Sequence, residues 1–231
     1  MPKTRIIGDV HGLVSNYKLK ALKNFNGPSI QVGDLGVGFA GDEDRDEYFD
    51  KIHKNGNHRF IRGNHDNPEV CKKIKGYIQD GTIEDDVMFI GGAWSIDGPN
   101  APWGSPFGRV EYIDWWKNEE CSDDQFKKFL SDYQHVKPRV MITHDCPAKV
   151  SKEMFFGSGL RKGSIYKNKT SGWLDEFIKV HQPDFWFFGH WHISYKYKYG
   201  NTYFVCLGEL DFIDVDLKNS EKIHKSVSKG Y

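Results

Sequence analysis

The sequence lacks the features that mark secreted, disulfide-rich or membrane proteins. It has four cysteines, and their wide spacing without a C-x-x-C pair argues against a disulfide framework or a cysteine zinc site. No apolar run approaches the roughly 20 residues that cross a bilayer. The chain reaches a polar motif at Asp9, which leaves no room for a signal peptide before it. We therefore predict a cytoplasmic protein without a membrane partner.

A net charge is also missing, because 32 Lys and Arg residues balance 32 Asp and Glu residues. No overall field then selects nucleic acid or an anionic membrane as a partner, so any basic binding surface has to be local. No linker, internal repeat or low-complexity segment divides the 231 residues. We predict one domain spanning residues 1–231, long enough to bury a substantial core.

What is present is an alternation of short apolar runs and amphipathic segments. The predicted strands are residues 4–7, 29–32, 58–61, 77–79, 82–84, 87–90, 139–142, 185–188, 195–207 and 212–217. The predicted helices are residues 15–25, 42–54, 68–74, 122–133 and 171–178, with Ser122 and Ser171 as N-caps. We expect a hairpin turn at Asp80-Gly81, a long loop at residues 147–170 and a polar tail after residue 217.

Clusters of metal-binding residue types follow five of the predicted strands. They are Asp9-x-His11, Asp34, Asn64-His65-Asp66, His144 and His190-x-His192. Loops at the carboxyl ends of strands converge in α/β proteins, so we expect these side chains to meet. Residues i and i+2 of an extended segment point the same way, which lets each D-x-H or H-x-H pair offer two donors to one centre. Imidazole and carboxylate donors together suit first-row metals. A single such histidine is more often structural, but five ordered clusters favour a metal site.

The segments Gly8-Asp9-Val10-His11-Gly12, Gly33-Asp34, Gly63-Asn64-His65-Asp66, His144 and Gly189-His190-Trp191-His192 resemble the signature series of the calcineurin-like metallophosphoesterases. The resemblance implies an α/β (α+β) fold, a four-layer αββα sandwich of two mixed β-sheets packed face to face with helices outside. It also implies two divalent metal ions, with manganese favoured and iron, zinc, nickel, cobalt or magnesium as alternatives. By matched position, the first metal would take Asp9, His11, Asp34 and His192. The second would take Asp34, Asn64, His144 and His190.

The resemblance further implies a phosphoesterase that hydrolyses a phosphomonoester or phosphodiester through a metal-bridging hydroxide. His65 would be the general acid that protonates the leaving oxygen, with Asp66 holding its imidazole. Asn64 is expected to contact the substrate as well as a metal. Arg62 is expected either to bind a phosphate with two hydrogen bonds or to be a salt-bridged surface residue.

Two departures bear on the branch of the family. Arg62 and Gly12 resemble the branch that contains the serine/threonine protein phosphatases and dinucleoside polyphosphatases. The segment from Gly33 to Gly38, however, lacks the Asp-Arg-Gly of that branch, and Asp145 replaces its glycine. The segment from Gly91 to Asp97 is similar to a bacterial and phage branch. A protein phosphatase is therefore the weaker alternative, and a non-catalytic metal-binding scaffold would require a lost ligand or acid, which the sequence does not show.

Residues 147–170 are predicted to form a rim of the active site. The segment is rich in basic residues, and Phe155, Phe156 and Tyr166 lie among them. Basic and aromatic side chains together suit a nucleotide or a nucleic-acid end, although a solvated loop is the alternative. A second candidate rim, used for either packing or stacking, consists of Trp103, Arg109, Trp115 and Trp116. The expected partner is a phosphoester substrate, with a nucleotide-like one as the hypothesis.

Overall fold

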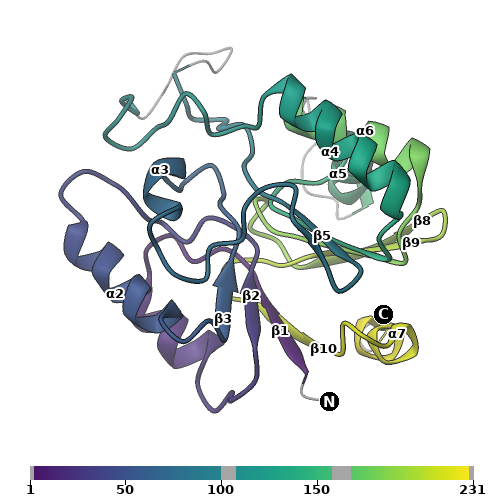
Figure 1. Ribbon diagram of the computed structural model, residues 1–231, viewed down its shortest axis with the longest axis horizontal. Coiled ribbons are helices and arrows are strands. Elements are labelled where there is room, and N and C mark those ends of the chain that lie inside the picture. Colours follow the sequence, from purple (N-terminus) through teal and green to yellow (C-terminus); the bar gives the residue numbers. More distant parts are fainter. Residues whose placement is uncertain (1–2, 100–107, 158–167, 229–231) are drawn as a thin grey trace.

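Two β-sheets face each other and carry helices on their outer sides (Figure 1). The computed structural model describes residues 3–99, 108–157 and 168–228 of the chain. Both sheets contain parallel and antiparallel pairs, and the helices complete four layers. This arrangement confirms the predicted αββα sandwich with two mixed sheets.

The smaller sheet has four strands in the order β10-β1-β2-β3. They are β1 (Thr4–Ile7), β2 (Ser29–Gln31), β3 (His58–Phe60) and β10 (Phe212–Val215). β1, β2 and β3 are parallel, and β10 pairs antiparallel with β1 at the edge. Layers cover both faces, so every residue of β1 and β2 except Thr4 is buried, including the polar Arg5, Ser29 and Gln31.

The larger sheet has six strands in the order β4-β5-β6-β7-β9-β8. They are β4 (Ile83–Glu84), β5 (Val87–Ile90), β6 (Val140–Thr143), β7 (Phe185–Phe188), β8 (Tyr195–Tyr199) and β9 (Thr202–Cys206). β5, β6, β7 and β9 are parallel, whereas β4 and β8 are antiparallel edge strands. Asp80-Gly81 does form a turn, closed by the hydrogen bond from Thr82 N–H to the Gln79 oxygen at 3.1 Å, but the prediction that it joins two hairpin strands is wrong. The β4–β5 turn is Asp85-Asp86, whose φ angles of 47° and 67° suit a two-residue hairpin.

Helices cover the outer faces of both sheets, except for the last one, whose apolar side chains join the core between the sheets. They are α1 (Val14–Asn16), the π-helix η1 (Tyr17–Ala21), α2 (Glu43–His53), α3 (Pro68–Cys71), α4 (Asp123–Val136), α5 (Ala148–Gly157), α6 (Lys169–Val180) and α7 (Ser220–Ser228). In Figure 1, α4, α5 and α6 lie over the larger sheet and α2 lies over the smaller one. The predicted capping box of Ser122 and Gln125 is present at the start of α4.

Three apolar clusters fill the spaces between the layers. One contains Ile6 and Ile30 of the smaller sheet with Phe89 and Phe187 of the larger sheet, so it is the core between the sheets. A second joins the outer face of the larger sheet to α4, α5 and α6. The third joins the outer face of the smaller sheet to η1 and α2. Because both sheets are held from both sides, the loops at their strand ends have a rigid base.

Three helical predictions need correction. The helix α6 begins earlier than expected, because Asn168 is its N-cap and Ser171 is the third residue of the capping box. The predicted loop at residues 147–170 contains α5, which buries Val150 and Met154 one turn apart; residues 158–167 lie outside the described residues. The predicted polar tail contains α7. Its Ile223 and Val227 are buried in the core between the sheets.

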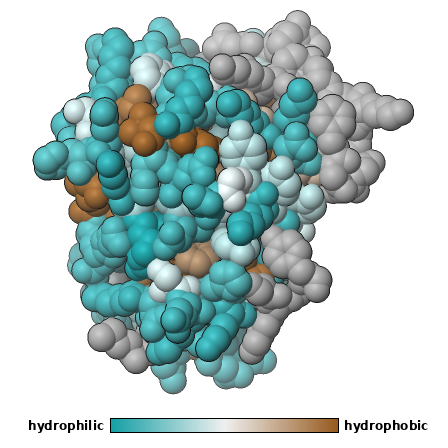
Figure 2. Space-filling model, turned by 90° about the vertical axis from the view of Figure 1, so that its right-hand side faces the viewer, coloured by the Kyte–Doolittle hydropathy of each residue, from teal (hydrophilic) through white to brown (hydrophobic). Residues whose placement is uncertain are grey.

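The face seen in Figure 2 is mostly hydrophilic, and its apolar side chains form small separate spots. Among the helices that the structure describes, none is both long enough and apolar enough to cross a membrane.

Candidate metal centre

The predicted ligands come together at the carboxyl ends of five parallel strands. Asp9 and His11 follow β1, Asp34 follows β2 and Asn64 follows β3 in the smaller sheet. From the larger sheet, His144 follows β6, and His190 and His192 follow β7. The two sheets therefore supply donors from opposite sides to one place between their upper edges.

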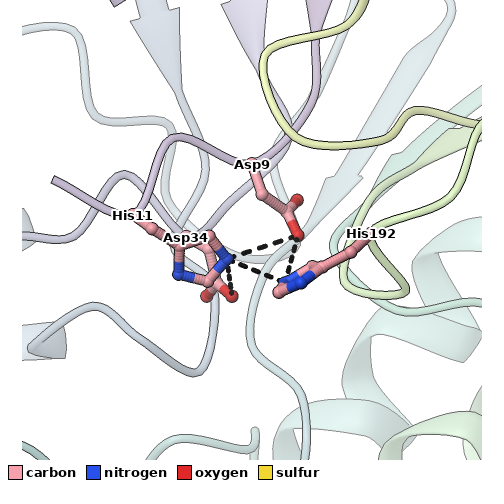
Figure 3. Close-up of side chains that lie close together, drawn as sticks. All are labelled: Asp9, His11, Asp34 and His192. Atoms are coloured by element: carbon pink, nitrogen blue, oxygen red, sulfur yellow. Dashed lines mark hydrogen bonds and ion pairs between the residues drawn. The ribbon is translucent and has the colours of Figure 1, made fainter. Parts of the chain in front are cut away.

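One group of donors consists of Asp9, His11, Asp34 and His192, which point toward a common centre (Figure 3). The Nε2 atoms of His11 and His192 are 2.8 Å apart. Oδ2 of Asp9 lies 3.8 Å from His11 Nε2 and 3.4 Å from His192 Nε2. Both carboxylates are buried, whereas the side chain of His192 is 51% exposed, so this group opens to solvent on the His192 side.

A second group shares Asp34 and adds His144, His190 and the Asn64 amide. Oδ1 of Asn64 is 3.0 Å from His144 Nε2 and 3.0 Å from His190 Nδ1. Oδ1 of Asp34 is 3.2 Å from His144 Nε2, while its Oδ2 is 3.7 Å from His11 Nε2. The two oxygens of this one carboxylate thus face the two groups.

Glycines before the ligands allow this close approach. A Cβ atom on Gly63 would lie 2.0 Å from Asp34 Oδ1, and one on Gly189 would lie 2.1 Å from Asp9 Oδ1. Real side chains do not approach so closely, so any other residue would push the carboxylates aside. The glycine that precedes these ligands in the sequence is therefore a requirement of the site itself.

Several of the predicted ligands have a strained backbone. The φ angles of His11, Asp34, His190 and His192 are 48°, 58°, 68° and 53°. Non-glycine residues rarely adopt this left-handed region, and such residues gather at functional sites where the surroundings hold them in place. Here the strain turns side chains from neighbouring loops toward the same centre.

The charges of the site favour a cation. Burial alone would lower the pKa of His144, but the Asp34 and Asp9 carboxylates raise it above its ordinary value. Burial opposes ionisation of Asp34 too, yet its electrostatic interactions, first of all with His144, hold its pKa well below the usual range. Burial and the charge of His144 lower the pKa of His190 to about 3, so this imidazole is neutral. The fold thus stabilises positive charge beside Asp34.

The orientation of His144 suits a metal ligand. Its Nδ1 lies 2.8 Å from the backbone oxygen of Val32, to which it donates a hydrogen bond. That bond leaves Nε2 as the nitrogen that faces Asp34 and Asn64. Histidines that bind metals commonly have their other ring nitrogen held in this way.

The predicted contact between Asp66 and His65 is wrong. The Asp66 carboxylate is fully buried and accepts hydrogen bonds from the backbone N–H groups of Leu35, Gly36, Val37 and Gly63. It therefore holds the loop after Asp34 against the turn before Asn64. His65 instead lies edge-on to His11, with ring centroids 5.0 Å apart, and burial lowers its pKa rather than raising it.

Arg62 is salt-bridged, as one of the two alternatives expected, but it is buried rather than at the surface. Its guanidinium is buried, with Nε 2.7 Å from Asp80 Oδ2 and Nη1 2.6 Å from the backbone oxygen of Glu119. Nη1 also donates to the backbone oxygen of Asn118, and Nη2 donates to Sγ of Cys121. These partners occupy the guanidinium N–H groups that a phosphate would need. Arg62 therefore forms a structural ion pair with Asp80.

Ser95 and Glu119 were missed by the reasoning from sequence. Both are buried, and the Ser95 hydroxyl accepts a hydrogen bond from Nδ2 of Asn64 at 3.0 Å. The only signal was the segment from Gly91 to Asp97, whose similarity to a bacterial and phage branch gave no role for Ser95.

The side chains of the second candidate rim that the structure describes are mainly packed inside the protein. Trp115 and Trp116 are buried, and Trp116 makes an edge contact with Phe39 at 5.2 Å. Arg109 is also buried and binds Asp97 and Ser95. In the first candidate rim, the ring of Phe155 in α5 contacts that of Trp191, with ring centroids 5.0 Å apart. Trp191 lies between His190 and His192 in the sequence. Trp103 and Tyr166 of the two candidate rims lie outside the described residues, as do the basic residues Arg161, Lys162 and Lys167 of the first rim and the side chain of Phe156.

The family model for calcineurin-like phosphoesterases matches residues 2–194, which include every predicted ligand. The chain belongs to this family. Membership confirms the resemblance carried by the five clusters and supports a metal-dependent phosphoesterase. No curated protein matches this calcineurin-like phosphoesterase.

Solved structures share its fold at low identity. The protein TT1561 of Thermus thermophilus is 14% identical, with a TM-score of 0.57 and coverage of 95% of this chain and 96% of that one. A candidate 5′-nucleotidase from Staphylococcus aureus, solved with alpha-ketoglutarate, is 12% identical with a TM-score of 0.48. The match covers 93% of this chain and 51% of that one, so this chain spans about half the length of that protein.

Proposed function

We propose that this phosphoesterase hydrolyses a phosphomonoester or phosphodiester with two divalent metal ions, manganese being favoured. The single observation that carries the proposal is the pair of donor groups that share the Asp34 carboxylate. Asp9, His11, Asp34 and His192 would hold one ion, and Asp34, Asn64, His144 and His190 the other. Imidazole, carboxylate and amide oxygen donors suit such ions. When bound, the ions would lower the pKa of a water molecule and offset the negative charge of the phosphate.

His65 is proposed as the acid that gives a proton from its imidazole to the leaving oxygen. Support comes from its place beside His11, at the more exposed of the two donor groups. Burial lowers the pKa of His65, so the imidazole is mainly neutral before substrate arrives. An anionic phosphate next to the ring would raise that pKa and let the ring take up the proton that it later donates.

A nucleotide-like ester is the proposed substrate class. Trp191 stands between two of the proposed ligands, is half-buried and contacts Phe155 of α5, so an aromatic surface adjoins the site. The ring of Trp191 also lies 5.0 Å from that of His190. An aromatic face beside the proposed ligands is suited to a base, because stacking on such faces contributes about 1–3 kcal/mol per base.

Two measurements test the proposal. Metal analysis of the purified protein, loaded separately with manganese, iron, zinc, nickel, cobalt and magnesium, should give two ions per chain. Each form is then assayed on p-nitrophenyl phosphate, bis-p-nitrophenyl phosphate, cyclic nucleotides, short oligonucleotides and a phosphopeptide. We expect metal-dependent turnover that a chelator abolishes, with nucleotide-like esters preferred. A protein that binds no ion pair and cleaves no phosphoester would refute the function, and a preference for the phosphopeptide would refute the substrate class.

A further inference from the structure

The side chain of Asn64 can turn either of two chemically different ends toward the proposed metal site. Its amide has an oxygen, which can bind a cation, and an NH₂ group, which cannot. The two ends have nearly the same shape, so space alone does not select one of them. In the structure the oxygen lies among His144, His190 and Asp34, and the NH₂ group points to Ser95.

The Ser95 hydroxyl has three partners, which together use all of its hydrogen-bonding capacity. It donates to Oε2 of Glu119 at 2.5 Å and accepts from Nη1 of Arg109 at 3.1 Å and from Nδ2 of Asn64 at 3.0 Å. Oε1 of Glu119 accepts the backbone N–H of Ser95 at 2.9 Å. Ser95 and Glu119 are 1% and 4% exposed, so water does not compete with these bonds.

Hydrogen-bond accounting then determines which end of Asn64 faces the site. A hydroxyl has one proton and two lone pairs. Arginine can only donate, so it takes one lone pair. Above its pKa of about 7 the Glu119 carboxylate is ionised and can only accept, so it takes the proton. The remaining lone pair needs a donor, and Asn64 can supply one only by turning its NH₂ group to Ser95. The amide oxygen is then left facing His144 and His190.

Arg62 holds the other side of this arrangement. It lies two residues before Asn64, and its Nη1 donates to the backbone oxygen of Glu119 at 2.6 Å. The ion pair between Arg62 and Asp80 is buried, so the Glu119 backbone is fixed relative to the loop that carries Asn64. The position of the segment that carries Glu119 is thus linked to the loop in which the Asn64 amide is oriented.

We propose that Ser95 and Glu119 are positioning residues that keep the Asn64 amide oxygen toward the second donor group. The proposal rests on the proposed function, in which Asn64 binds the second ion. Ser95 and Glu119 act through Asn64 rather than as ligands. The Glu119 carboxylate accepts the proton of the Ser95 hydroxyl, so this hydroxyl can only accept a hydrogen bond from Asn64. The charge of the buried Glu119 carboxylate therefore decides whether the oxygen of the Asn64 amide faces the second donor group.

The substitution Glu119→Gln reverses the direction of these bonds at nearly constant shape. If the glutamine oxygen keeps the Ser95 backbone N–H, its NH₂ group donates to the Ser95 hydroxyl. Arg109 and Gln then fill both lone pairs, and the hydroxyl proton needs a new acceptor. Asn64 provides it by turning its oxygen away from the site. Ser95→Ala removes the link, Ser95→Thr keeps the hydroxyl, and Ser29→Ala deletes a buried hydroxyl at the far end of β2 as a matched control.

The first test is metal-independent. In metal-free, ¹⁵N-labelled protein at a pH above the pKa of Glu119, the side-chain NH₂ protons of Asn64 should give nuclear Overhauser contacts to the Ser95 side chain. In Glu119→Gln these contacts should be replaced by contacts to the His190 ring, whereas Ser95→Thr and Ser29→Ala should keep them. Wild-type contacts to His190 instead of Ser95, or an unchanged pattern in Glu119→Gln, would overturn the proposal whether or not the protein binds metal.

The second test counts manganese ions by calorimetric titration and by the electron paramagnetic resonance signal of a coupled pair. We expect Glu119→Gln and Ser95→Ala to bind the second ion about 10–100-fold more weakly and the first ion as before. Ser95→Thr should restore the pair. Wild-type affinity for both ions in Glu119→Gln and Ser95→Ala would overturn the positioning role. A wild-type protein that binds no pair would refute the proposed function, and the amide contacts would still decide the orientation.

Discussion

The substitution Asp66→Asn discriminates between two roles for Asp66. Its Oδ2 accepts the backbone N–H groups of Leu35 at 3.1 Å and Gly63 at 2.7 Å, and its Oδ1 accepts those of Gly36 at 2.6 Å and Val37 at 3.2 Å. Asparagine has one acceptor oxygen, so its NH₂ group must face two of these donors in either orientation. Two buried N–H groups then lose their acceptor.

The cost follows from the two orphaned donors. Leaving a buried donor without a partner costs about 1–3 kcal/mol, so the pair costs roughly 4 kcal/mol. This is a large part of the 5–15 kcal/mol that typically stabilises a folded domain, so the effect should be easy to measure. The loop after Asp34 would also loosen, and with it the carboxylate that faces both donor groups.

The assay is urea unfolding of the metal-free protein, followed by manganese titration of the folded protein. Asp175→Asn is the matched control, because that buried carboxylate accepts one backbone N–H, from Lys149, which an asparagine oxygen can still take. We expect a cost of about 1 kcal/mol or less for the control. If Asp66 only oriented His65, Asp66→Asn would lower turnover and leave both stability and metal binding unchanged. That result would refute the structural role.

Three further predictions concern single side chains. His65→Ala should retain two manganese ions and lose about 10²–10⁴-fold in kcat on p-nitrophenyl phosphate; an unchanged kcat would exclude the acid role. Arg62→Ala leaves the Asp80 carboxylate buried without its partner and should lower the free energy of unfolding by about 3–5 kcal/mol; a raised KM with normal stability would instead indicate phosphate binding. Burial raises the pKa of Glu119 from its ordinary 4.5 to about 7, so the folded state holds this proton more tightly than the unfolded chain does. The free energy of unfolding should therefore fall by about 3 kcal/mol as pH rises from 4.5 to above 7, and Glu119→Gln should abolish this change; parallel pH profiles in the two metal-free proteins would contradict it.

The sandwich was predictable because its elements leave local signals. Short apolar strands followed by helices indicate parallel sheets, and the capping box of Ser122 and Gln125 marks the start of α4. Elements with weaker local signals were missed. α5 and α7 each bury only a few apolar side chains in a polar segment, and their helical state depends on the sheets against which they pack.

The metal centre was predictable for a related reason. Each proposed ligand lies within four residues after the end of a strand, and parallel strands bring their carboxyl ends to one edge whatever the details of packing. The glycines that precede Asp9, Asp34, Asn64 and His190 are part of the same local pattern. Chain order and strand direction were therefore sufficient to gather the donors.

The roles of Arg62, Asp66, Ser95 and Glu119 depended on the tertiary structure alone. The partners of Arg62 lie 18 and 57 residues away in the chain, and Glu119 is 24 residues from Ser95. Nothing local distinguishes a buried arginine from one that binds phosphate, or a structural carboxylate from one that orients a histidine. Only the packed fold removes water from these groups, and that exclusion determines which donor each acceptor must take. The sequence alone thus determined which side chains gather at the strand ends, and tertiary packing decided how they are oriented.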